Sequence, residues 1–152
     1  MPLTDLVAPN AIIPALKVNN KKQVLQELAA RAAALTGQNE KTIFDTLMQR
    51  EKLGSTAVGN GIAIPHCFTD EVPDLLITVA RSRTGLEFDS FDGKPTQVVF
   101  LLMGNRQEHS LHLKALARIA RLIKSTSFIE KIVASSTVEG MVSAFEKEEA
   151  KI

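Results

Sequence analysis

The chain has 152 residues, of which 45% are apolar and 23% are charged, and these values are typical of one globular domain spanning residues 1–152. The formal net charge of +1 provides no overall field that would attract nucleic acid or an anionic membrane, so an anionic ligand needs a local site. The single cysteine excludes an internal disulfide. The sequence shows no secretory signal and no apolar run near the roughly 20 residues of a membrane span, so we expect a cytoplasmic protein that is not embedded in a membrane.

The first third of the chain predicts two helices after an irregular lead-in. Three prolines interrupt residues 1–18, where we expect a turn or a short strand. Apolar residues then follow helical spacing from Lys21 to Leu35 and again from Glu40 to about Glu51. The expected N-caps are Asn19 or Asn20 for the first helix and Asn39 for the second.

The middle of the chain predicts a loop and three strands. Ser55 to Gly61 is small and polar, which indicates a loop. Ile62 to Ile64 predicts a short strand that ends at Pro65. Two runs rich in β-branched residues, Leu75 to Arg81 and Thr96 to Met103, predict longer strands.

Three further helices are expected after these strands. The first runs from Leu111 to Lys124, a capping box of Ser127 and Glu130 opens a second that reaches about Ala134, and Thr137 to Lys147 forms the last. The expected buried stripe of the first of these helices is Leu113, Leu116, Ala117, Ala120 and Ile123. Helices before and after the strands indicate an α/β sandwich, although strand direction does not follow from this pattern.

The segment GSTAVGNG, which begins at Gly54, invites comparison with a phosphate-binding loop. Gly54 and Gly59 have the required spacing, but Asn60 and Gly61 stand where such a loop needs Lys and Ser or Thr. This argues against a nucleotide triphosphatase. Backbone N–H groups between glycines, together with the hydroxyls of Ser55 and Thr56, can still hold an anion, and the alternative is a plain turn.

Three side chains outside the loop are candidates for the chemistry. His66 directly follows a proline at an expected strand end, where a neutral imidazole can act as a nucleophile toward phosphorus or can simply bond to the backbone. Arg50 suits a phosphoryl group, and its alternative is a solvated charge at a helix end. His112 is either a partner of His66 or a satisfied core histidine. A metal site is a further alternative, with possible ligands His66, Cys67, His109 and His112.

Two segments resemble a known family. REKLGSTAVGNGIAIPH, Arg50 to His66, is similar to the signature of the fructose/mannitol-type (type-2) enzyme IIA domains of the bacterial phosphoenolpyruvate-dependent phosphotransferase system. HLKALARIARLI, which begins at His112, resembles the second histidine region of the same family. The resemblance implies a single domain with a mixed central β-sheet that helices flank on both faces.

The resemblance also implies site residues, a partner and a reaction. His66 accepts a phosphoryl group from a phosphohistidine of the carrier HPr or its nitrogen-branch counterpart, Arg50 contacts that group and His112 packs beside the active histidine. Neither a metal nor another cofactor takes part. The residues expected to line the site are Ser55, Thr56, Gly59, Asn60 and Gly61. We also expect an apolar depression around His66 for the carrier, with a wall of Ile62, Ile64, Phe68 and Val72.

The sequence shows no attached IIB or IIC domain, and its GNGIAIPH form resembles the nitrogen-regulatory branch of the family. That branch implies a phosphocarrier that changes regulated partners, such as a transporter, a kinase or a IIB protein, according to its phosphorylation state. One alternative is a sugar-specific IIA component that passes the phosphoryl group to a IIB domain. The others are a binding module that responds to an anion without covalent chemistry and a metal-dependent hydrolase.

Overall fold

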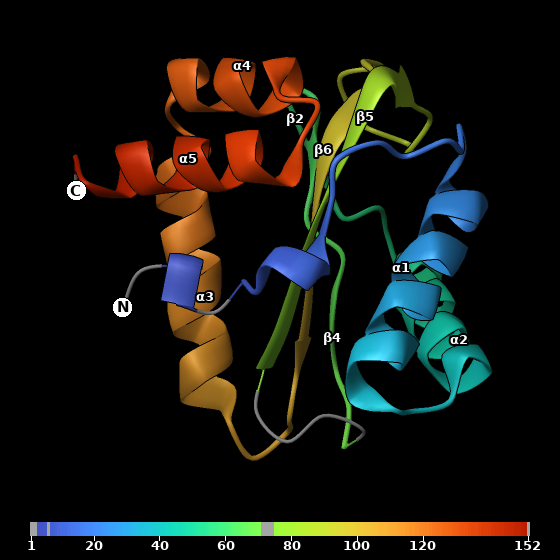
Figure 1. Ribbon diagram of the computed structural model, residues 1–152. Helices are drawn as coiled ribbons and strands as arrows, with labels where there is room; N and C mark the ends of the chain where they lie inside the picture. The colour runs from blue at the N-terminus through green and yellow to red at the C-terminus, as the bar shows by residue number, and fades with distance from the viewer. Residues whose placement is uncertain (1–2, 6, 71–74, 152) are drawn as a thin grey trace.

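The fold is a three-layer α/β sandwich, seen in a computed structural model that describes residues 3–5, 7–70 and 75–151. Helices α1 and α2 cover one face of the sheet, and α3, α4 and α5 cover the other (Figure 1). Each face has its own cluster of buried apolar side chains. The expected sandwich is therefore confirmed. Within the described residues, no helix is both long and apolar enough to cross a membrane.

The helices begin and end where local signals place them. Asn20 caps α1 by accepting a hydrogen bond from the backbone N–H of Gln23, and Asn39 caps α2 in the same way. Gly37 ends α1 with a φ of 75°, a left-handed conformation that favours glycine. The helices are α1 (Lys21–Thr36), α2 (Glu40–Lys52), α3 (His109–Leu122), α4 (Thr126–Ala134) and α5 (Val138–Glu149), preceded by short 3₁₀ turns at Leu3–Asp5 and Pro9–Ala11.

The sheet is mixed, as the family resemblance implied. Its strands are β1 (Ile12–Ile13), β2 (Ala57–Gly59), β3 (Ile62–Ala63), β4 (His66–Phe68), β5 (Leu75–Leu86) and β6 (Thr96–Gly104). The order is β1-β5-β6-β3-β2, and β4 pairs with β6 beyond the end of β3. Strands β5 and β6 run antiparallel at the centre, whereas β1, β3 and β4 each run parallel to their neighbour.

The segment expected to be a loop contains a strand. Residues 57–59 form β2, which pairs antiparallel with β3 in a tight hairpin. The turn residues Asn60 and Gly61 have φ values of 56° and 80°, and an Asn-Gly pair is the commonest solution for such a turn. Strand β4 was missed because it begins immediately after Pro65, and β5 continues past Arg81 to Leu86.

The expected buried stripe of α3 is only partly right, because Leu116 and Ile123 are half-buried against the core but Ala117 and Ala120 are exposed. The side chains that face the sheet are His112, Ala115, Ile119 and Leu122, whereas Leu113 is 60% exposed. The helix carries Leu or Ala on more than one side, so spacing alone selected the wrong side. The cap of α4 also differs, because Ser125 and not Ser127 accepts the hydrogen bond from the backbone N–H of Phe128.

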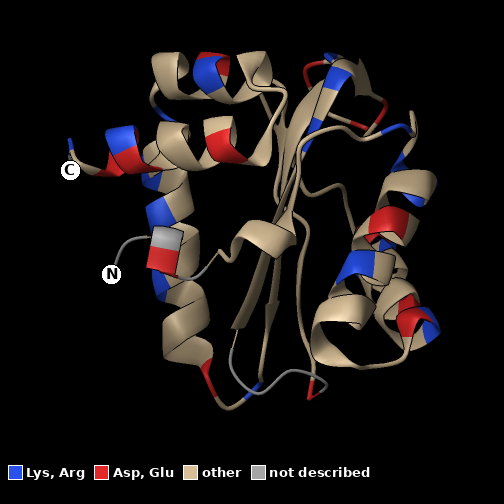
Figure 2. Ribbon diagram, in the orientation of Figure 1, with Lys and Arg blue, Asp and Glu red and all other residues tan. Residues whose placement is uncertain are grey.

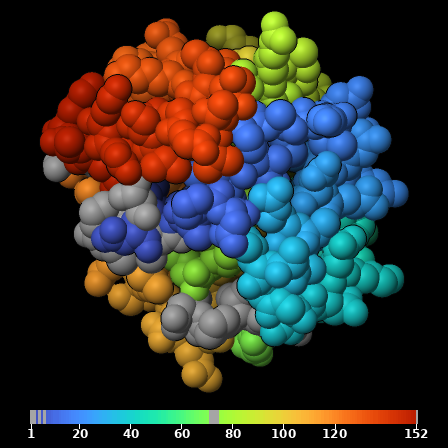
Figure 3. Space-filling view, viewed as in Figure 1, coloured from blue at the N-terminus to red at the C-terminus, as the bar shows by residue number. Residues whose placement is uncertain are grey.

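Charged residues lie mainly on the outward sides of the helices and in loops, and most of the sheet carries none (Figure 2). On the face shown in Figure 3, the chain around Pro9–Ala11 lies between α5 and α1 and closes the front of the molecule. The backbone of this segment is tied to α1 through Arg31, whose guanidinium donates to the carbonyl oxygen of Asn10 at 2.7 Å.

Candidate functional site

His66 begins β4, which pairs with β6 beyond the point where β3 ends. Strand β3 pairs with Val98 and Val99, β4 pairs with Leu102–Gly104, and Ile64-Pro65 separates the two. The backbone stays anchored across the break, because the N–H of Leu102 donates to the carbonyl oxygen of Pro65 at 2.9 Å. His66 is therefore held on a rigid sheet rather than on a loop.

One ring nitrogen of His66 is committed to the backbone. Its Nδ1 lies 2.7 Å from the carbonyl oxygen of Ile64. Because a carbonyl oxygen can only accept, Nδ1 carries a proton in this contact, and in the neutral ring Nε2 keeps its lone pair. The backbone N–H of Ile64 in turn donates to the carbonyl oxygen of Thr56 at 2.9 Å, which fixes the accepting peptide.

A small cavity of about 260 Å³ adjoins the ring. Arg50 lies at the end of α2, and its Nη1 donates to the carbonyl oxygen of Gly54 at 2.9 Å, so the guanidinium folds back over the start of the loop. Apart from this bond, the Arg50 guanidinium makes no hydrogen bond with the described residues. The lining residues are Arg50, Ser55, Thr56, Ala57, Val58, Ile64, His66 and Leu116.

Ser55 and Thr56 line this cavity, but the protons of their hydroxyls are used elsewhere. The Ser55 hydroxyl donates to the carbonyl oxygen of Phe88 at 2.7 Å, and the Thr56 hydroxyl donates to the Glu51 carboxylate. Neither proton is available to an anion in this arrangement. Their expected role as phosphate donors stays a prediction, and the structure gives both residues a role in shaping the loop.

His112 reaches toward His66 from α3, with ring centroids 6.1 Å apart. It is buried, and neither ring nitrogen has a hydrogen-bond partner among the described residues. Burial lowers its pKa, and the nearby His66 and His109 lower it further, so the imidazole is held neutral. Phe68 lies against this ring and the His109 ring, at centroid distances of 4.3 and 4.2 Å.

Gly104 makes room for His112. A Cβ atom at this position would lie 2.5 Å from Nδ1 of His112, a distance that real contacts do not show. The glycine of β6 therefore lets the imidazole sit directly against the sheet, beside Phe68 of β4.

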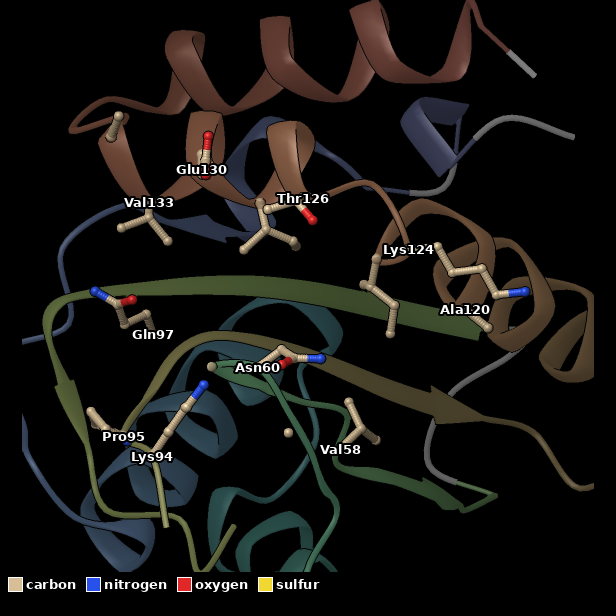
Figure 4. Close-up of a pocket in the computed structure, with 15 residues that line it drawn as sticks. Val58, Asn60, Lys94, Pro95, Gln97, Ala120, Lys124, Thr126, Glu130 and Val133 are labelled. Atoms are coloured by element: carbon tan, nitrogen blue, oxygen red, sulfur yellow. The ribbon is translucent and has the colours of Figure 1, made fainter. Parts of the chain in front are cut away.

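The other three expected loop residues lie elsewhere. Gly59, Asn60 and Gly61 form the tip of the hairpin and line a separate, larger cavity of about 940 Å³, which α4 and the end of α3 complete. Figure 4 shows Lys94 and Asn60 pointing into this cavity from below and Val133 and Thr126 facing them from α4. The structure thus divides the expected loop into residues beside His66 and residues beside the second cavity.

Cys67 belongs to neither cavity. Its side chain is buried in the core beneath α1 and α2, on the opposite face of the sheet from His66, and burial raises the pKa of the thiol to about 11. The metal alternative also lacks support, because no cluster of three His, Cys, Asp or Glu side chains with metal-binding geometry occurs in the part of the chain that the structure describes.

Glu51 was missed from the sequence. It is a buried carboxylate directly after Arg50, and it binds both Lys21 and Thr56. The available signal was its position, because a Glu in the last turn of a helix opposes the helix dipole and calls for a compensating partner.

Comparisons with known proteins match this arrangement. The model of the family described as "Phosphoenolpyruvate-dependent sugar phosphotransferase system, EIIA 2" matches residues 5–148. A nitrogen regulatory protein of Bradyrhizobium diazoefficiens is 53% identical over 143 residues, which cover 94% of each chain. The crystal structure of nitrogen regulatory protein IIA-Ntr from Neisseria meningitidis has a TM-score of 0.87 at 27% identity, covering 94% of this chain and 98% of that one.

The crystal structure of IIA mannitol from Escherichia coli shares the fold at 18% identity, with a TM-score of 0.77 and coverage of 91% of this chain and 98% of that one. The family match covers nearly all of the described residues, including Arg50, His66 and His112. The chain therefore belongs to the EIIA 2 family of the phosphoenolpyruvate-dependent sugar phosphotransferase system.

Proposed function

We propose that this chain is a phosphoryl carrier that accepts a phosphoryl group on Nε2 of His66 from a phosphohistidine of an HPr-type protein, and that it forms one domain over residues 1–152. The observation that carries the proposal is the hydrogen bond between Nδ1 of His66 and the carbonyl oxygen of Ile64. It leaves the lone pair of Nε2 available in a cavity that Arg50 also lines.

The transfer step balances within the two imidazoles and the phosphoryl group. The Nε2 lone pair of His66 attacks phosphorus in line, and the P–N bond to the donor breaks with its electron pair returning to the donor nitrogen. The donor ring carries a proton on its other nitrogen, so it leaves as a neutral imidazole while the His66 ring takes up the positive charge. The proton on Nδ1 stays in place, bonded to the Ile64 carbonyl. Because one P–N bond replaces another, the step is close to balanced in energy and runs in both directions. The Arg50 guanidinium stabilises charge on the transferring oxygens.

His112 acts in this proposal as a neutral donor. Its lowered pKa leaves one ring N–H and one lone pair, and neither has a partner in the described structure. A phosphoryl oxygen on His66 would give the ring N–H an acceptor, which removes the cost of a buried unpaired donor. Phosphorylation thereby completes the hydrogen bonding of a site that is incomplete without it.

The carrier docks on apolar surface beside the cavity. Leu116 lines the cavity, and Leu113 is exposed one turn before it on the same helix. Of the wall expected from the sequence, Ile64 lines the cavity and Phe68 is partly exposed, but Ile62 is buried. Val72 lies outside the described residues. We expect a small interface with rapid release, as a relay requires.

A regulatory output is favoured over a sugar-specific role. A nitrogen regulatory protein that is 53% identical matches 94% of this chain, and a second one that is 31% identical matches 91%. Phosphorylation adds close to two negative charges beside Leu116, so a partner that accepts the free surface would reject the phosphorylated one. The regulated partner, whether a transporter, a kinase or a IIB protein, and the cytoplasmic location remain predictions.

An intact-mass measurement tests the proposal. The protein is incubated with phosphoenolpyruvate, enzyme I and HPr or the nitrogen-branch HPr counterpart, and one added phosphoryl group is expected. The added mass should disappear in acid and should be absent in His66→Ala, whereas His109→Ala should still carry it. No added mass with active carriers of both branches would reject the phosphoryl carrier and favour the anion-responsive binding module.

A further inference from the structure

A buried carboxylate lies behind the cavity. Glu51 is 7% exposed, and its Oε2 accepts from the Lys21 ammonium at 2.9 Å and from the backbone N–H of Thr56 at 3.2 Å. Its Oε1 accepts from the Thr56 hydroxyl. Both donors of Thr56 are thus directed at one carboxylate, which sets the position of this residue more firmly than a loop contact would.

Thr56 continues the chain of contacts to the reactive ring. Its carbonyl oxygen accepts from the N–H of Ile64 at 2.9 Å, and the carbonyl oxygen of Ile64 accepts from Nδ1 of His66 at 2.7 Å. An unbroken series of hydrogen bonds therefore runs from Lys21 on α1, through Glu51 on α2, to the imidazole on β4. Thr56, Ile64 and His66 line the cavity, whereas Lys21 and Glu51 do not.

We propose that Glu51, charge-balanced by Lys21, is a positioning residue that acts through Thr56 and Ile64 to hold His66 in the tautomer and orientation needed for phosphoryl transfer. This inference rests on the proposed function of His66. It assigns a role to two residues that touch neither the cavity nor the transferring group, since neither Glu51 nor Lys21 lines it.

Lys21 offsets the free-energy cost of burying the Glu51 carboxylate. An unbalanced charge at this depth would be costly, and the C-terminal end of α2 adds further negative potential. Burial by itself would lower the pKa of Lys21, but its hydrogen bonds with Glu51 and Asp89 outweigh that effect and raise the pKa. Lys21 therefore stays charged across the physiological range and can balance the Glu51 carboxylate.

A second set of contacts holds the same loop from its other side. Lys21 also pairs with Asp89 at 3.1 Å and lies 4.9 Å from the centroid of the Phe88 ring. The carbonyl oxygen of Phe88 accepts from the Ser55 hydroxyl. Ser55 and Thr56 are thus both held through Lys21 and its partners, which explains why neither hydroxyl proton is free for an anion.

The test uses two isosteric variants and two controls. Glu51→Gln removes the charge, and Thr56→Val removes the hydroxyl. Thr56→Ser restores the hydroxyl, and Asp45→Asn removes the carboxylate of an exposed pair with Lys41 on the same helix. Two readouts are compared in each protein: the imidazole ¹⁵N spectrum of His66 without any carrier, and the rate of phosphorylation at saturating and limiting carrier.

We expect Glu51→Gln and Thr56→Val to shift the Nδ1–H population of His66 toward a mixture and to lower the saturated rate about 10- to 100-fold, with little change in KM. Asp45→Asn should match the unmodified protein, and Thr56→Ser should recover most of the rate that Thr56→Val loses. Folded Glu51→Gln and Thr56→Val proteins with an unchanged tautomer and rate would overturn the inference. If Glu51→Gln does not fold, Thr56→Val alone decides between these outcomes.

The spectrum separates the two proposals. If the unmodified protein takes no phosphoryl group, the proposed function fails, yet a tautomer shift in the variants would still show that Glu51 positions His66. If the protein is phosphorylated and the variants leave the spectrum and the rate unchanged, only the positioning role fails.

Discussion

The Nδ1 atom of His66 and the carbonyl oxygen of Ile64 lie 2.7 Å apart, so the imidazole is tied to the backbone two residues back, in the link between β3 and β4. This contact predicts that the phosphoryl group is bound to Nε2. ³¹P and ¹⁵N NMR of the phosphorylated protein should show phosphorus coupled to Nε2, with a proton retained on Nδ1. Coupling to Nδ1 would mean that the Ile64 contact breaks before transfer.

Arg50 is expected to act on the rate more than on the fold. Its guanidinium lines the cavity, and its one hydrogen bond in the described structure is to Gly54. Arg50→Gln should slow phosphorylation by about 100-fold, because a charged donor to the transferring oxygens is lost. Arg50→Lys should recover only part of the rate, since an ammonium lacks the planar pair of donors.

Stopped-flow or quench-flow phosphorylation by the carrier measures these rates. Lys52→Gln, an exposed cation on the same turn of α2, is the matched control and should leave the rate unchanged. An equal loss in Lys52→Gln and Arg50→Gln would indicate a general electrostatic effect on carrier encounter instead of a contact with the phosphoryl group.

Leu113 should matter for the carrier and not for the chemistry. It is 60% exposed and one turn before Leu116, which lines the cavity. Leu113→Gln should raise the KM for the carrier roughly fivefold and leave the saturated rate and the melting temperature nearly unchanged, because an exposed apolar contact is removed. A lowered saturated rate with an unchanged KM would place Leu113 outside the docking surface.

Local sequence signals predicted where the helices begin and end better than they predicted which side of a helix is buried. Asn20, Asn39 and Gly37 mark the ends of α1 and α2 through hydrogen bonds within a few residues, so the sequence carries that information directly. The buried side of α3 depends on which face meets the sheet. Ala115 is buried and Leu113 is exposed, which inverts the order that hydrophobicity predicts.

The residues of the candidate site also fall into those that the sequence reveals and those that only the fold brings together. His66 and Arg50 stand in one contiguous segment, so a resemblance of short motifs reaches both. The pair of Lys21 and Glu51 joins residues 30 positions apart, and only the packing of α1 against α2 brings them together. The hairpin turned Asn60 toward a different cavity, because β2 pairs with β3 and carries the tip away from the ring.

The stability of the protein should depend on pH through His112. An imidazole in the unfolded chain takes up a proton as the pH falls through about 6.5, whereas burial lowers the pKa of His112 in the folded chain. The unfolded state then binds more protons, so the stability is complete above about pH 6.5 and is lost as the pH falls below it.

Melting temperatures between pH 5 and 8 check this prediction. His112→Leu should flatten the decline on the acid side, while His109→Gln, which removes an exposed imidazole, should leave most of it. An unchanged acid-side decline in His112→Leu would assign the effect to groups other than His112.

Gly104→Ala should destabilise the fold and disturb the site together. The added methyl group would lie 2.5 Å from Nδ1 of His112, so the ring must move away from the sheet and from Phe68. We expect a loss of about 1–3 kcal/mol in the free energy of unfolding, measured with urea, and a slower phosphorylation. In a His112→Ala background only the Cβ atom of residue 112 remains, 3.4 Å from the added methyl group, so the same substitution should then cost much less. An equal loss in the free energy of unfolding in both backgrounds would show that the added methyl group clashes with the strand and that Gly104 is not needed to accommodate His112.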